Sequence, residues 1–234
     1  MQRRQGNNSG MAWREVVQHW LDFSDEDTVT LSTDSGYEDY ILGLTDRRSD
    51  EFWGLRYAIG IGTPRYSVDS LGNKAGYFVN VGSGYNNSLG SVSPVANLTS
   101  YTKEFFIVAQ MRSQSTYDYI AGGSTVTNSL ISKNANNDFG LLSSSAGGVS
   151  LELTGGSTTN EIFAVSVQVS DASSAINGGT LFLGSRGGAT QDRQWGCSAY
   201  IYQFMSFNSI LTQKERNSLF QFFKQKYPSI INIS

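Results

Sequence analysis

The sequence predicts an all-β protein, an antiparallel β-sandwich closed by one C-terminal α-helix. Only 16% of the 234 residues are charged, and the chain has 25 Gly but just 3 Pro, which is typical of short strands joined by tight turns. No internal repeat and no charged or Pro-rich linker divides the chain. We therefore predict a single sandwich domain over residues 11–234. A polar arm, residues 1–10, precedes it and is too rich in Arg, Gln, Asn and Gly to form a core of its own.

The predicted elements begin near the N-terminus. Trp13, Val16, Val17 and Trp20 recur at helical spacing, which predicts one or two helical turns before a strand at 19–23. Runs of β-branched and aromatic residues between Gly- and Asn-containing turns predict further strands. These strands are expected at 54–60, 77–82, 105–112, 117–121, 138–142, 149–153, 161–169 and 180–184.

The last forty residues carry the clearest pattern. Residues 200–207 predict a strand with apolar side chains on both faces. Thr212 can cap the free amides of a helix, and Glu215 can accept a hydrogen bond from the Thr212 N–H. Pro228 ends the helix, which we predict over 212–227. One broad face of this helix is apolar and must dock on the sheet: Leu219, Phe220, Phe222, Phe223 and Tyr227.

Segments along nearly the whole chain resemble the concanavalin A-like (LamG-like) jelly-roll domains of phage virion and bacterial surface proteins. They are HWLDFSDEDTVT at 19–30, LTDRRSDEFWGL at 44–55, FFIVAQMR at 105–112, AINGGTLFLGSRGG at 175–188, and the closing strand with its LTQKER turn and helix. The resemblance implies a jelly-roll sandwich. Lectins, glycosidases and structural modules all use this fold, so the fold alone does not assign a function.

No pattern typical of catalysis is found. Glycosidases of the resembled fold carry closely spaced carboxylates on one strand, whereas Glu152 stands alone on its predicted strand. His19 is the only histidine, and the sequence offers it no evident catalytic partner. We predict that the chain is not an enzyme and uses no cofactor; a glycosidase-like enzyme with a divergent site is the third-ranked alternative. Asp25 to Asp27 could ligate calcium, but we favour a turn or helix start there.

Charge is unevenly distributed. Residues 22–51 contain ten acidic residues against two arginines, and the closing helix contains four basic residues against one Glu. We interpret both regions as solvated surface. A net charge of −3 and the lack of a stacked aromatic–basic ladder exclude nucleic acid as an expected partner. Cys197, the only cysteine, is predicted to be a small buried side chain.

The expected partner is therefore a protein surface or a glycan. No apolar run is long enough for membrane insertion, and the N-terminus lacks the apolar segment of a signal peptide. We predict a non-enzymatic bacteriophage virion accessory protein, a capsid decoration or fibre component, made in the host cytoplasm and docked on a large protein assembly. The alternative is a carbohydrate- or host-receptor-binding lectin-like module. Its candidate glycan contacts are aromatic residues and their polar neighbours: Tyr85, Asn86, Asn87, Tyr117, Asp118, Asp192 and Trp195.

Overall fold

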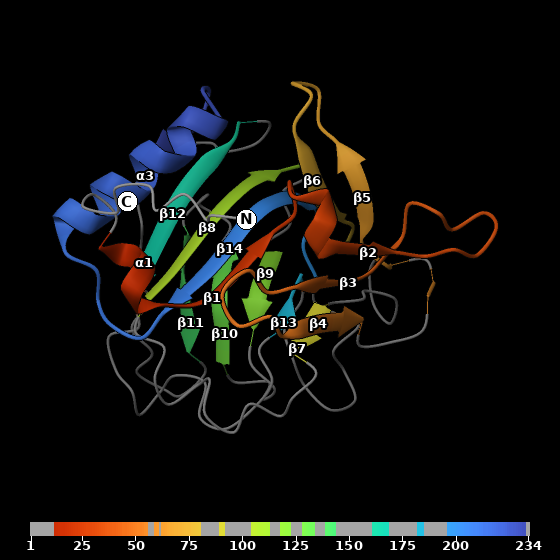
Figure 1. Cartoon of the computed structure of the whole chain (residues 1–234), viewed down its shortest axis with the longest axis horizontal. Coiled ribbons are helices and arrows are strands. Elements are labelled where there is room, and N and C mark those ends of the chain that lie inside the picture. Colours follow the sequence, from red (N-terminus) through yellow and green to blue (C-terminus); the bar gives the residue numbers. More distant parts are fainter. Residues whose placement is uncertain are drawn as a thin grey trace, which may run out of the picture.

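Two antiparallel sheets and one long helix make up the part of the chain that the computed structural model describes (Figure 1). This part comprises residues 12–55, 59–60, 62–80, 89–91, 104–112, 118–122, 128–133, 139–143, 161–168, 182–184 and 196–232. The all-β class predicted from the sequence is thereby confirmed.

The first sheet has the strand order β15-β12-β8-β14-β6-β5, and β1 pairs with the second half of β14. All of its pairs are antiparallel except the short parallel pair of β12 and β15. Its strands are β1 (Val17–Asp22), β5 (Arg65–Val68), β6 (Lys74–Phe78), β8 (Glu104–Met111), β12 (Phe163–Gln168), β14 (Ala199–Phe207) and β15 (Ile231–Asn232).

The second sheet is fully antiparallel, with the order β11-β10-β9-β13-β7-β4-β3-β2. Its strands are β2 (Val29–Leu31), β3 (Ile41–Thr45), β4 (Phe52–Leu55), β7 (Leu89–Ser91), β9 (Asp118–Gly122), β10 (Asn128–Lys133), β11 (Phe139–Ser143) and β13 (Phe182–Leu183).

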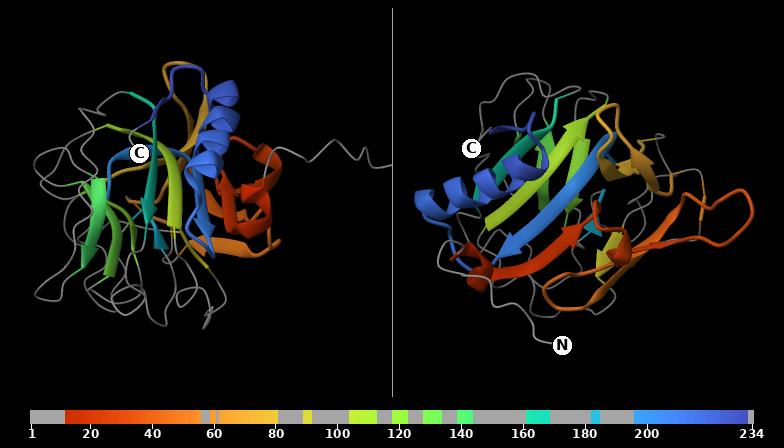
Figure 2. Two further views of the ribbon diagram at one scale, coloured as in Figure 1. Left: turned by 90° about the vertical axis from the view of Figure 1, so that its left-hand side faces the viewer. Right: turned by 45° about the horizontal axis from the view of Figure 1, so that its top comes forward.

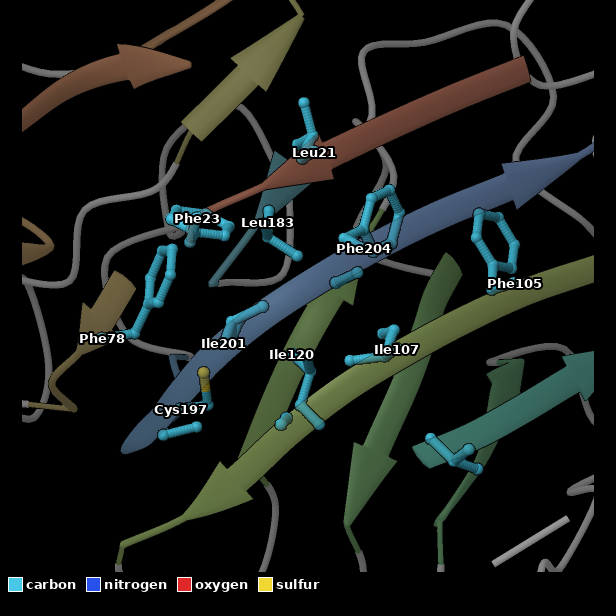
Figure 3. Packing of buried hydrophobic residues seen from close by; sticks show 14 of the residues in the cluster. Leu21, Phe23, Phe78, Phe105, Ile107, Ile120, Leu183, Cys197, Ile201 and Phe204 are labelled. Atoms are coloured by element: carbon cyan, nitrogen blue, oxygen red, sulfur yellow. The ribbon is translucent and has the colours of Figure 1, made fainter. Parts of the chain in front are cut away.

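The main hydrophobic core lies between the two sheets. Phe204 and Ile107 of the first sheet meet Ile120 and Leu183 of the second in one buried cluster (Figure 3). Cys197 is buried in the same cluster, as the sequence predicted. The two sheets are therefore packed face to face around a shared apolar layer.

The other face of the first sheet is covered by α1 (Trp13–Val16) and α3 (Gln213–Lys226) (Figure 2). Thr212 is the N-cap of α3 and forms the predicted capping box with Glu215. Phe223 is fully buried and stacks on Phe106 of β8, with ring centroids 5.6 Å apart. The helix prediction is confirmed in its start, its end and its docking face.

Two buried carboxylates fasten this helix to the sheet. Glu104 is fully buried and accepts hydrogen bonds from Arg216 Nε at 2.7 Å and Arg216 Nη2 at 2.8 Å. Asp22 is 1% exposed and lies 3.2 Å from Lys226 Nζ and 2.7 Å from Arg47 Nη1. The interpretation of the helix cations as merely solvated was wrong for Arg216 and Lys226. Their spacing from Leu219 and Phe223 places them beside the docked face, where they neutralise buried charge.

The remaining strand predictions succeed where the apolar run is long. The predicted strands at 105–112 and 161–169 match β8 and β12 closely. The predicted helical turn is confirmed only over Trp13–Val16, because Val17 and Trp20 lie in β1, which begins two residues before the predicted strand at 19–23. The predicted strands at 54–60 and 77–82 correspond to β4 and β6, which begin two and three residues earlier and end five and four residues earlier. Sequence patterns did not indicate β2, β3, β5, β7, β10 or β15. The predicted strand at 149–153 and the arm at 1–10 lie outside the described residues.

Candidate ligand-binding site

Most of the glycan contacts predicted from the sequence cannot be placed. Tyr85, Asn86, Asn87, Tyr117, Asp192 and Trp195 lie outside the described residues. Asp118 opens β9, and its register partner is Lys133 on β10. These seven residues stay predictions, and the structure brings a different group of side chains together.

That group lies on the loop between β2 and β3, residues 32–40, which projects from the sandwich on the side away from α3 (Figures 1 and 2). Its residues 33–39 are all exposed. Tyr37 is 44% exposed, the largest exposure among the aromatic side chains that the structure describes. An aromatic ring held in water by its own loop is available to a ligand.

Two successive tight turns shape the loop. Tyr37 N–H donates to the Asp34 carbonyl at 3.0 Å, and Tyr40 N–H donates to the Tyr37 carbonyl at 3.0 Å. Gly36, between the acceptor and the donor of the first turn, has a φ of +84°, which a residue with a Cβ rarely adopts. The sequence Asp-Ser-Gly-Tyr therefore sets the direction in which Tyr37 leaves the loop.

The ring of Tyr37 rests on a rigid base. It packs edge-to-face on Tyr40, with centroids 5.1 Å apart and an interplanar angle of 72°. Tyr40 is 6% exposed; the Arg65 guanidinium lies 4.6 Å from the centroid of its ring, and Arg65 Nη2 donates to its hydroxyl at 2.7 Å. A backbone hydrogen bond from Tyr66 N–H to the Asp39 carbonyl (2.6 Å) joins the loop to β5. The second sheet's loop is thus anchored on the first sheet.

We call this group the Tyr37 platform and define it by six residues: Asp34, Tyr37, Glu38, Asp39, Tyr40 and Arg65. Asp39 lies 3.5 Å from Arg65, and both side chains are about half exposed. Glu38 accepts a hydrogen bond from Gly36 N–H at 3.0 Å, and this bond lowers the pKa of Glu38 below its usual value. The platform offers one apolar ring face, several carboxylate acceptors and one guanidinium donor, a combination suited to a polyhydroxylated ring.

Phe52 is the second exposed aromatic side chain among the described residues, at 39%. It lies on the face of the second sheet opposite to buried Trp53, and its ring covers Gly43, where a Cβ would clash with it. Gly54, the register partner of Gly43, has no side chain either. The register partner of Phe52 is Thr45, and neither β3 nor β4 contributes a residue to the Tyr37 platform, so Phe52 serves below as a control for Tyr37.

His19 has a partner that the sequence analysis missed. His19 Nδ1 and Asp46 Oδ2 are 2.7 Å apart, and both side chains are buried. Asp46 also accepts from the backbone N–H groups of Trp20 (3.2 Å), Arg48 (2.7 Å) and Ser49 (3.2 Å). Burial works to raise the pKa of Asp46, but the hydrogen bonds from His19 and Arg48 outweigh it and hold that pKa below its ordinary value.

The sequence showed no partner for His19, and the structure places Asp46 against it. Asp46 lies 27 residues away in the turn between β3 and β4, and no local pattern links the two positions. The pair ties this turn to β1, since Arg47 N–H also donates to the Trp20 carbonyl at 2.9 Å. We call the His19–Asp46 pair, which joins β1 to this turn, the clasp.

The acidic run at 25–27 forms a turn. Asp25 caps the 3₁₀ helix η1 (Glu26–Thr28) by accepting from Asp27 N–H at 3.3 Å, and it lies 3.1 Å from Arg47 Nη1. This agrees with the turn interpretation. Within the described ranges, no group of three His, Cys, Asp or Glu side chains is arranged to hold a metal ion. No helix in the same ranges is long and apolar enough to cross a membrane.

Solved structures of Trypanosoma rangeli sialidase share this fold. Its complex with 2,3-difluoro-KDN matches with a TM-score of 0.53 and 12% sequence identity, over 91% of this chain and 33% of the sialidase. Its complex with sialic acid matches with a TM-score of 0.52 and 10% identity over the same shares. The chain thus spans about one third of the protein it resembles. No family model and no curated protein matches the sequence.

These neighbours contradict the prediction that the chain is not an enzyme, because the proteins that share its fold are sialidases. That prediction rested on a carboxylate spacing expected of glycosidases and on an unpartnered His19, and His19 is partnered. Identities of 10–13% establish the fold alone. Sialidase activity is accordingly a property of those proteins and is not assigned here.

Proposed function

We propose that this chain is a lectin-like carbohydrate-binding module with a concanavalin A-like jelly-roll fold, and that it binds a glycan on the Tyr37 platform. The fold is supported by two antiparallel sheets around one core and by the closing strand, turn and capped helix. Sialidase neighbours solved with sugar ligands are consistent with a fold that handles carbohydrate.

One observation carries the proposal. Tyr37 exposes 44% of its surface while its ring is fixed edge-to-face on Tyr40, which is itself held by Arg65. A fixed ring loses little side-chain entropy when a ligand stacks on it. The flanking carboxylates and the Arg65 guanidinium supply the directional hydrogen bonds that sugar hydroxyls require.

Glycan-array binding followed by calorimetry tests this function. Tyr37→Ala should weaken binding about tenfold or more, because it removes the stacking surface, and Tyr37→Phe should retain most of the affinity. Phe52→Ala removes an equally exposed ring elsewhere and should leave binding unchanged.

The same binding measurements show whether the glycan site lies elsewhere in the chain. If Tyr85→Ala or Trp195→Ala abolishes binding and Tyr37→Ala does not, the residues predicted from the sequence carry the function. If no glycan binds the folded wild-type protein, the lectin proposal fails.

An accessory role in a phage virion, docked on a larger protein assembly, stays a prediction from the sequence resemblance. No observation on the described residues favours it over glycan binding. Finding the protein at a regular position in a purified particle would support it, and its absence from such particles would contradict it.

A further inference from the structure

The charge of the Tyr37 platform narrows the class of glycan, provided that the platform binds a glycan as proposed above. Asp34, Glu38 and Asp39 contribute three carboxylates, and residues 32–40 contain no Lys or Arg. Arg65 is the platform's single cation. The residues of the platform therefore carry a net charge of about −2.

Arg65 does little to offset this charge at the exposed end of the platform. Its guanidinium is turned toward the base, where it contacts the Tyr40 ring and hydroxyl and lies 3.5 Å from Asp39. The Asp34 carboxylate has no partner among the described residues, and Glu38 is bonded only to backbone N–H groups. The acceptors nearest to Tyr37 in the chain thus keep their negative charge.

Such a surface discriminates by charge. A carboxylated sugar would place a like charge beside three carboxylates, which costs binding free energy. An ammonium group would gain charge-assisted hydrogen bonds to carboxylates that are already ionised and exposed. A neutral sugar would gain only the stacking and the ordinary hydrogen bonds.

We propose that the glycan bound by the Tyr37 platform is a hexosamine with a free ammonium group, its apolar ring face stacked on Tyr37 and its ammonium paired with Asp34 or Glu38. This preference is opposite in charge to the sialic acid held in one of the sialidase neighbours. The apolar face of a sugar ring can stack on Tyr37, and because a basic side chain can also contact an aromatic ring, the test below includes a lysine peptide.

The test uses four probes in calorimetry with the whole chain: a glucosamine hexamer, an N-acetylglucosamine hexamer, a sialylated trisaccharide and a lysine hexamer. The glucosamine hexamer should bind about tenfold more tightly than its acetylated counterpart, and the sialylated probe should bind least. The double variant Asp34→Asn/Glu38→Gln should reduce the tenfold preference to about twofold. Its binding of the acetylated probe, which has no ammonium group, should weaken less than its binding of the glucosamine hexamer.

A matched control variant removes two exposed carboxylates that lie outside the platform. Glu15 and Asp27 are exposed on α1 and η1, so Glu15→Gln/Asp27→Asn should keep the preference for glucosamine. Raising the ionic strength should weaken glucosamine binding and leave the acetylated probe nearly unaffected.

Three outcomes would overturn the inference. Equal or tighter Tyr37-dependent binding of the acetylated or sialylated probe rejects the charge preference and leaves the glycan-binding function standing. Binding of the lysine hexamer as tight as that of glucosamine, unaffected by Tyr37→Ala, indicates an acidic protein-docking surface. No Tyr37-dependent binding of any sugar rejects the proposed function itself.

Discussion

Carboxylates lie in two different settings on the two sides of this sandwich. Under α3, Glu104 and Asp22 are 0% and 1% exposed, and each is matched by a cation of the helix. On the loop that projects from the other side, Asp34, Glu38 and Asp39 are exposed, and the one cation of the platform is Arg65 of β5.

The contrast follows from solvation. An ion removed from water must be compensated by a partner, so the buried Glu104 and Asp22 are paired and offer no free charge to a ligand. Water solvates the loop carboxylates at no cost to the fold, so they can remain available. The helix-covered face is therefore structural, and the Tyr37 platform can exchange water for a ligand.

The largest effect is expected where a charge enters the docked face. Phe223 is fully buried against Phe106, so Phe223→Asp should lower the free energy of unfolding by more than about 4 kcal/mol or prevent folding. Lys224→Asp places the same acid at the neighbouring exposed position and should change stability by less than about 1 kcal/mol. Urea denaturation measures both. Equal stability of the two variants would mean that α3 is not docked as described.

Removing a helix cation should cost slightly less. Arg216→Ala leaves the Glu104 carboxylate buried without its bidentate partner and should destabilise by about 3 kcal/mol. Lys214→Ala, an exposed position on the same turn, should stay within about 0.5 kcal/mol of the wild type. The double variant Glu104→Leu/Arg216→Leu should recover much of the loss. A double variant as unstable as Arg216→Ala would show that the buried charge is not the cause.

Acid should destabilise the fold mainly by protonating Asp46 in the clasp and Asp22 under α3, and less by protonating the carboxylates of the platform. Burial acts to raise the pKa of Asp22, yet Lys226 and the hydrogen bonds from Ser24, Gln203 and Arg47 lower it; the pKa of Asp46 is lowered as well. A carboxyl whose folded pKa lies below its unfolded value of about 3.9 stabilises the fold above that pH. This stabilisation is lost as the pH falls through the folded pKa.

The free energy of unfolding should therefore be steady from about pH 7 to pH 5 and fall below about pH 4. Denaturant unfolding of Asp46→Asn should show a smaller fall between pH 5 and pH 3 than the wild type. Asp34→Asn, on the exposed loop, should follow the wild-type curve. A fall of the same size in Asp46→Asn would reject the clasp as a source of acid sensitivity.

The smallest effect on stability is expected at the platform itself. Tyr37 is nearly half exposed, and its ring covers only part of Tyr40. Tyr37→Ala should therefore change the free energy of unfolding by less than about 0.5 kcal/mol. A loss above about 2 kcal/mol would make Tyr37 a structural residue and remove the basis of the platform.

Local signals in the sequence predicted α3 well and the platform poorly. Thr212 and Glu215 are three residues apart, so the capping box could be recognised directly. Tyr40 and Arg65 are 25 residues apart, and Glu104 and Arg216 are 112 apart, so their pairing depends on the sheet topology. The sequence showed that residues 22–51 are acidic. Composition alone does not distinguish Asp46, which is bonded to His19, from Asp34, which has no side-chain partner among the described residues.

The most direct test of the platform is the map of amide chemical shifts when a glycan binds. Titrating the labelled protein with the glucosamine hexamer, or with the tightest ligand of the array, should shift the amides of residues 34–40 and of Arg65 and Tyr66. The amides of α3 should not move. Shifts concentrated on α3, or on the strand that carries Phe52, with residues 34–40 unchanged would contradict the assignment of binding to the Tyr37 platform.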